Sequence, residues 1–157
     1  MNQLSRVRAV LLGGLVAGTL DILFAITYAA FNGLTPVKLL QTIASGLLGN
    51  AAFEGGLPTA ILGLAGHFGM SYLWAALFVA AASRLPQLVA KPAVAGPVFG
   101  ILVFFTMRLV ILPLSAFPFP IVFRPLSWGL DLLSHMFFFG LPIALAAANA
   151  IAPGRPR

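Results

Sequence analysis

Four long apolar stretches dominate this chain of 157 residues and exclude most folds. They cover about residues 7–31, 59–82, 93–112 and 126–148. At a rise of about 1.5 Å per residue, a helix of each length crosses a hydrocarbon core of about 30 Å. Because 61% of the residues are hydrophobic and only 8% are charged, a polar surface could not cover a soluble domain of this size. We therefore expect an all-α membrane protein, with four transmembrane helices forming a single domain over residues 1–157.

The segment of about residues 36–53 has a different pattern. Thr35 followed by Pro36 is typical of a helix start, and Gly55-Gly56 is typical of a helix end. Between these signals, an apolar stripe lies opposite a polar one. The apolar stripe is Leu40, Ile43, Ala44, Leu47, Leu48 and Ala51, and the polar stripe is Lys38, Gln41, Thr42 and Ser45. The pattern predicts an amphipathic helix that lies in the membrane interface or partly re-enters the bilayer.

The basic residues indicate how the spans are oriented. Six of the nine fall on one side of the predicted topology: Arg6, Arg8, Arg84, Lys91, Arg155 and Arg157. Only Lys38 and Arg124 lie in connections on the other side. Because basic residues collect on the cytoplasmic side, we expect both termini to be cytoplasmic. The chain has no basic patch with interleaved aromatic residues, so the bilayer is the expected partner and nucleic acid is not.

A few ionisable residues interrupt the spans, and they are expected to meet. Asp131 and His135 are four residues apart on one helix face, and the other spans contribute Asp21, His67 and Arg108. Counting the rise along each helix places all five near one level, in the outer half of the membrane. Since each such group is costly alone in an apolar environment, we predict that they form one polar cluster.

The charge of this cluster favours a role in transport. Two carboxylates and one guanidinium leave a net charge of minus one if both histidines are neutral, and a proton or a cation would balance it. We therefore interpret the cluster as a site of proton-linked or small-solute transport or sensing, to which the nearby loop residue Glu54 could gate access. Four short helices leave little room for a pathway within one subunit, which favours a homo-oligomer.

Other interpretations of the same residues stay open. The cluster could be structural, with Arg108 paired to a carboxylate and the histidines bonded to carbonyl groups. It could hold Zn or Fe through His67, His135 and Asp131, or a haem between the two histidines; otherwise no cofactor is expected. Because the chain has no Ser-His-Asp arrangement and no glycine-rich phosphate loop, an enzymatic activity is not favoured.

Glycine and proline residues predict how the spans pack. Glycines spaced for close helix contact are Gly14 and Gly18 in the first span, Gly63, Gly66 and Gly69 in the second, and Gly96 and Gly100 in the third. Pro142 predicts a kink in the last span. Four prolines between residues 113 and 125 predict a stiff extended cap over the outer face.

Three short motifs carry a resemblance to a known family. They are Gly66-His67 in the second span, Pro113-Leu114 at the end of the third, and Asp131 followed four residues later by His135. With them, the chain resembles the YagU-like family of small bacterial inner-membrane proteins over most of its length. The resemblance implies a bacterial inner membrane and a role for His67, Asp131 and His135. It implies no particular reaction.

Overall fold

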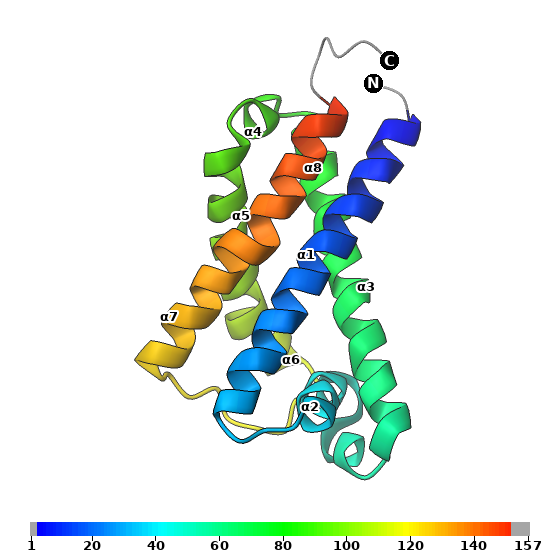
Figure 1. Cartoon of the computed structure of the whole chain (residues 1–157), viewed down its shortest axis with the longest axis vertical. Helices are drawn as coiled ribbons and strands as arrows, with labels where there is room; N and C mark the ends of the chain where they lie inside the picture. Colours follow the sequence, from blue (N-terminus) through cyan, green and yellow to red (C-terminus); the bar gives the residue numbers. More distant parts are fainter. Residues whose placement is uncertain (1–2, 152–157) are drawn as a thin grey trace.

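Every regular element in the described part of the chain is helical. A computed structural model describes residues 3–151, and no strand occurs in that range. The long helical segments pack side by side in Figure 1, and shorter helices lie at both ends. In chain order the elements are α1 (Gln3–Phe31), α2 (Pro36–Leu48), η1 (Gly49–Phe53), α3 (Gly56–Ala82), α4 (Gln87–Ala90), α5 (Pro92–Thr106), η2 (Met107–Ile111), α6 (Leu112–Leu114), α7 (Pro125–Ser134), η3 (His135–Gly140) and α8 (Leu141–Ile151).

Among the described residues, four helical segments are long and apolar enough to cross a membrane. They are Gln3–Phe31, Gly56–Ala82, Pro92–Leu114 and Pro125–Ala150. The third consists of α5, η2 and α6, and the fourth of α7, η3 and α8. Each predicted span lies within one of these segments, so the number and positions of the long apolar helices are confirmed. The fold is compatible with a multi-pass membrane protein.

The two ends of the bundle differ in their basic residues. Figure 1 shows the start of α1, the end of α8 and the short α4 at one end, with α2 and the loop before α7 at the other. Arg6 and Arg8 therefore share an end with Arg84 and Lys91, which flank α4. The predicted Arg155 and Arg157 lie outside the described residues.

The buried core lies in the half of the bundle near the start of α1 and the end of α8, which we call the terminal half. Its members are mostly small: Ala9, Ala17, Ala75, Phe78, Val79, Ala82, Val103, Phe139, Ile143, Ala144 and Ala147. Glycine lets α1 pack closely against α3. A Cβ atom at Gly14 would lie only 2.4 Å from the ring of Tyr72, so a larger residue would not fit there. The predicted close contact at Gly14 and Gly18 is therefore confirmed.

Glycine also brings α5 against the last span. A Cβ atom at Gly100 would lie 2.1 Å from the carbonyl oxygen of His135, and one at Gly96 would lie 2.6 Å from Cα of Leu141. These contacts are between backbones, so no side-chain movement could relieve them. In the second span the prediction holds only for Gly63, whose neighbour is Leu40 of α2; Gly66 and Gly69 have open space beside them.

The second helix begins as predicted, and residues from both of its stripes, such as Ala44 and Gln41, are buried. The Thr35 hydroxyl caps α2 by accepting the N–H of Lys38 at 3.3 Å. Gln41 and Ser45, from the predicted polar stripe, are buried, and Gln41 Nε2 donates to the Gly56 carbonyl at 3.0 Å. Leu47 and Leu48, from the apolar stripe, are exposed. Gln41 therefore faces the start of α3, where its Nε2 also lies 3.2 Å from the hydroxyl oxygen of Thr59.

Two π-helical turns widen the third and fourth spans. They are η2 and η3, and a Leu-Pro pair follows each one, at Leu112-Pro113 and Leu141-Pro142. The N–H of Leu112 bonds to the Met107 carbonyl, five residues earlier, and Leu141 bonds likewise. A proline ring crowds the carbonyl four residues before it, so a wider turn relieves that contact. The disturbance predicted at Pro142 is therefore a π-helical turn.

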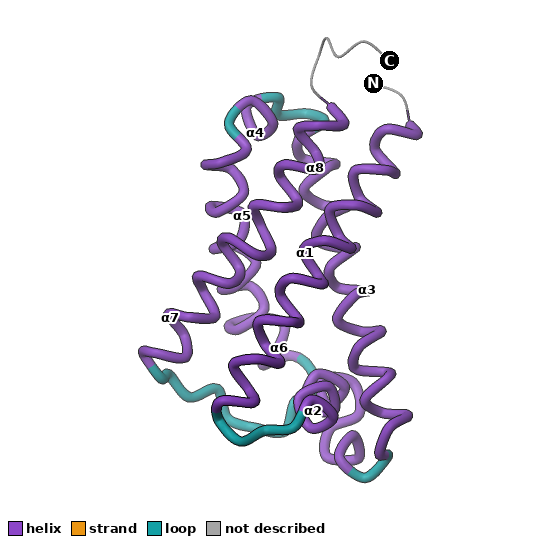
Figure 2. The backbone as a smooth tube through the Cα atoms, viewed as in Figure 1, coloured by secondary structure: helices purple, strands orange, loops and turns teal. Residues whose placement is uncertain are grey.

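The proline-rich connection between α6 and α7 is irregular, as predicted. Figure 2 shows it as a loop that runs along the same end of the bundle as α2. The N–H of Ala116 donates to the Gly46 carbonyl at 2.9 Å, which ties the loop to α2. Phe119 adds an aromatic contact with Phe53, with ring centroids 5.6 Å apart. The loop and α2 therefore form one layer across this end.

Candidate functional site

Three ionisable side chains from the third and fourth spans contact one another. Arg108 of η2 donates to Oδ2 of Asp131 through Nε at 3.1 Å and also through Nη2. The other carboxylate oxygen, Oδ1, lies 3.2 Å from Nδ1 of His135. We call these residues the Arg–Asp–His group. Both oxygens of Asp131 thus have partners, and α7 is tied to η2.

Aromatic rings hold the guanidinium of Arg108 in place. Its Cζ atom lies 5.3 Å from the ring centroid of Trp128 and 5.7 Å from that of Phe104. Trp128 is itself fixed, because its Nε1 donates to the Val122 carbonyl at 3.1 Å. A cation over aromatic faces is attracted by their quadrupole, so these rings and Asp131 together compensate the charge of Arg108.

The backbone determines which ring nitrogen of His135 carries a proton. Nδ1 lies 2.9 Å from the backbone carbonyl oxygen of Asp131. That oxygen can only accept a hydrogen bond, so we assign the neutral tautomer with its proton on Nδ1. Within the described residues, Nε2 of His135 has no hydrogen-bond partner. It is therefore free to bind a second proton.

Asp21 reaches the same region from the first span. Its Oδ1 accepts the hydroxyl of Ser134 at 2.8 Å, and Ser134 is the buried residue that precedes His135. His135 also interacts electrostatically with Asp21. Within residues 3–151, no basic side chain forms an ion pair with Asp21. The two carboxylates therefore differ, since Asp131 is paired with a cation and Asp21 is not.

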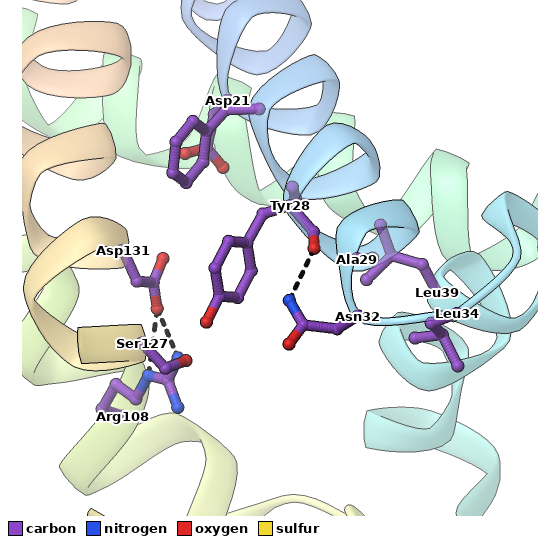
Figure 3. A pocket seen from close by; sticks show the side chains of 11 residues that line it. Asp21, Tyr28, Ala29, Asn32, Leu34, Leu39, Arg108, Ser127 and Asp131 are labelled. Carbon is purple, nitrogen blue, oxygen red and sulfur yellow. Dashed lines mark hydrogen bonds and ion pairs between the residues drawn. The ribbon is translucent and has the colours of Figure 1, made fainter. Parts of the chain in front are cut away.

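A cavity of about 340 Å³ lies beside this region, and neither His135 nor Ser134 lines it. Its lining includes Asp21 from α1, Arg108 from η2 and Asp131 from α7. Figure 3 shows the Arg108–Asp131 pair on one side and Tyr28 projecting its ring and hydroxyl toward that pair from α1. The other lining residues are Phe24, Ala25, Ala29, Asn32, Leu34, Leu39 and Ser127. The cavity is mainly apolar, and its charged groups have a net charge of minus one.

The prediction placed His67 in the cluster, but it is bonded elsewhere. Its Nε2 lies 2.9 Å from the Gly18 carbonyl oxygen, which makes it a hydrogen bond from α3 to α1. It forms no hydrogen bond or ion pair with the Arg–Asp–His group or with Asp21, as far as the described residues go, and it does not line the cavity. Counting residues along a helix estimated its height, but not the direction in which the side chain points.

Three further predicted roles find no counterpart in the geometry. In the described range, no group of three or more His, Asp or Glu residues could hold a metal ion, so His67, His135 and Asp131 do not form a metal site. His67 bonds to α1 and His135 to α7, an arrangement that does not present two imidazoles to a haem. Glu54 is exposed and does not line the cavity.

The protein encloses its charged residues only in part. In residues 3–151 no charged residue is fully buried, and the side chains of Arg108 and Asp131 are 26% and 28% exposed. The sequence interpretation also missed Ser134, Phe104 and the cavity position of Tyr28. Ser134 could have been found from its place beside His135, but the aromatic partners carry no signal beyond ordinary packing.

Comparison of the chain with protein-family models, with curated proteins and with solved structures found no match. The site is therefore interpreted from its own chemistry.

Proposed function

We propose that this chain is an integral membrane protein that carries out proton-linked transport or sensing of a small solute. The observation that supports it is the cavity, because three ionisable residues from three different elements line it. Ionisable groups within spans usually serve a function, since their cost is otherwise hard to offset. His135 would bind the proton through Nε2, and the cavity would hold the solute.

Proton binding would change the charge balance of the site. Asp21, Asp131 and Arg108 together carry minus one, and a proton on His135 brings the four residues to zero. A solute that neutralises the same charge would compete with this proton. Such competition is the simplest physical basis for coupling a proton to a solute.

The setting of the site is part of the proposal. We infer a bacterial inner membrane with both termini in the cytoplasm, which would place the cavity in the outer half of the bilayer. The exposed Leu47 and Leu48 support a position of α2 partly within the bilayer. A homo-oligomer and membership of the YagU-like family remain parts of the same proposal, the latter based on the three sequence motifs.

Proton movement into liposomes tests the function. Purified protein is reconstituted with a trapped pH-sensitive dye, and the vesicles are loaded separately with a small organic cation, a small organic anion or an uncharged polyol. After external acidification, we expect faster internal acidification than in protein-free vesicles with at least one of these loads. His135→Ala should remove the difference, because it removes the proton-binding nitrogen.

His67→Ala is the matched control, since it removes the other histidine of the spans without touching the cavity. It should leave the rate unchanged. A rate equal to that of protein-free vesicles under every load, or a His135→Ala rate equal to the wild-type rate, would contradict the proposal.

One observation favours a second candidate, a non-transporting protein whose charged residues are structural. Both oxygens of Asp131 are satisfied within the chain, so the pair could serve only to join η2 to α7. Under this alternative, His135→Ala would leave proton movement unchanged while variants of Arg108 and Asp131 would still lower stability.

A further inference from the structure

The unpaired carboxylate of Asp21 is the main unexplained group in the cavity. Asp131 has a guanidinium on one oxygen and an imidazole on the other. Asp21 has only the hydroxyl of Ser134, and no cation of the described chain forms an ion pair with it. A carboxylate within a span needs compensation for its charge, and a hydroxyl group provides little. The site therefore lacks one positive charge beside Asp21.

The wall next to Asp21 is aromatic. Phe24 and Tyr28 follow it at three and seven residues along α1, which places all three on one helix face, and all three line the cavity. The rings of Phe24 and Tyr28 are stacked, with centroids 6.3 Å apart and planes 6° from parallel. A carboxylate beside aromatic faces is the usual recognition chemistry for organic ammonium groups.

The rest of the cavity argues against an anion. Among the described residues, Arg108 is the only basic residue of the lining, and it is already paired with Asp131 and held between Trp128 and Phe104. Alanine and leucine side chains form most of the remaining wall and suit the apolar part of a solute. The volume of about 340 Å³ is at the lower end of the range of ligand pockets, about 300–1,000 Å³.

We propose that the cavity binds a small organic cation, with its positive group beside Asp21 and its apolar part against Phe24 and Tyr28. This inference rests on the proposed function, because it names the class of solute that the cavity would carry. Binding itself can be measured without any transport, so the two proposals can fail separately.

A charged probe and its uncharged isostere test the inference in purified, detergent-solubilised protein. Choline carries a quaternary ammonium, and neohexyl alcohol has the same shape with carbon in place of nitrogen. Calorimetric titration should detect binding of choline and at least about tenfold weaker binding of the alcohol, since a charge contact of this kind is worth about 1.4 kcal/mol or more. Sodium at equal concentration should not displace choline, because it cannot use the aromatic wall.

Variants of Asp21 and Tyr28 test whether choline binds at this aromatic wall. Asp21→Asn keeps the shape and removes the charge, so it should weaken choline binding at least about tenfold. Tyr28→Ala should weaken binding severalfold, whereas Tyr28→Phe keeps the ring and should bind as well as the wild type. Glu54→Gln is the matched control, because it removes an exposed carboxylate outside the cavity.

The comparison of probes needs no variant, so it decides the inference even if Asp21→Asn fails to fold. No binding of choline, equal binding of the alcohol, displacement by sodium, or unchanged binding in a folded Asp21→Asn protein would overturn it. Choline binding without proton movement would support this inference while contradicting the proposed function. Proton movement without choline binding would support the proposed function and contradict this inference.

Discussion

The two halves of the bundle are built by different rules. The terminal half packs small apolar side chains from α1, α3 and α8 into a core, in which Ala17, Ala75 and Ala144 are fully buried. The other half, which we call the cavity half, contains a cavity with two carboxylates and a guanidinium in its wall. Small residues let backbones approach closely, whereas long charged side chains keep helices apart and need partners. The terminal half thus contains the packed core, whereas the ionisable residues of the candidate site lie in the cavity half.

The boundary between the halves is the backbone contact at Gly100, and breaking it should have the largest effect. Gly100→Ala places a Cβ atom 2.1 Å from the carbonyl oxygen of His135, so α5 and η3 must move apart. We expect a loss of about 3 kcal/mol in the free energy of unfolding, or no folded protein. Thermal unfolding in detergent measures it.

Gly66→Ala is the control for that substitution, because a Cβ atom at Gly66 would meet no atom of another element within 4 Å and the residue lies within α3. Alanine should be neutral there or stabilise by up to about 1 kcal/mol. Equal stability of the two variants would show that the close contact does not define the boundary.

The Arg–Asp–His group should contribute less to stability than the Gly100 contact, because its side chains are partly exposed. Asp131→Asn leaves Arg108 without its counter-charge, and Arg108→Gln leaves Asp131 without its own. We expect each to cost about 2 kcal/mol, below the range for fully buried pairs. The double variant should cost less than the sum by about 1 kcal/mol or more, as measured by the same unfolding assay.

Arg124→Gln is the matched control for the cavity half, because Arg124 is an exposed basic residue at the start of α7. It should change stability by no more than about 0.5 kcal/mol. Additive effects of the two cluster variants would show that the ion pair is not the interaction that ties η2 to α7.

Removing a side-chain hydrogen bond between α3 and α1 should lower the free energy of unfolding by a smaller amount. His67→Ala removes the bond to the Gly18 carbonyl, and Ser71→Ala removes a bond of 2.7 Å to the Gly14 carbonyl. Each should lower the free energy of unfolding by about 1 kcal/mol, without changing proton movement or choline binding. If His67→Ala lost proton movement or choline binding, His67 would have to be counted as part of the functional site.

The smallest effect is expected at Glu54. This carboxylate is exposed and lies outside the cavity, so Glu54→Gln should change stability by less than about 0.5 kcal/mol. Proton movement should also be unchanged in the liposome assay. A clear change in its rate would support the role of Glu54 as a gate and would extend the site beyond the cavity.

Part of the candidate site was predictable from local sequence. The spacing of Asp131 and His135 placed both on one helix face, and η3 begins only at His135, so that spacing survives in the structure. The ion pair of Arg108 with a carboxylate was one interpretation of its charge and of its estimated level in the membrane. The same estimate of height wrongly joined His67 to the group, because a similar level does not imply a shared direction.

What the sequence determined by itself is the number, position and alternation of the apolar spans. These depend on length, hydropathy and local signals such as the Thr35-Pro36 start, all of which act within one segment. Only the tertiary structure decided which side chains face one another. That depends on the rotation of each helix about its axis, which is fixed by distant backbone contacts such as that of Gly100 with His135 and by the π-helical turns before Pro113 and Pro142.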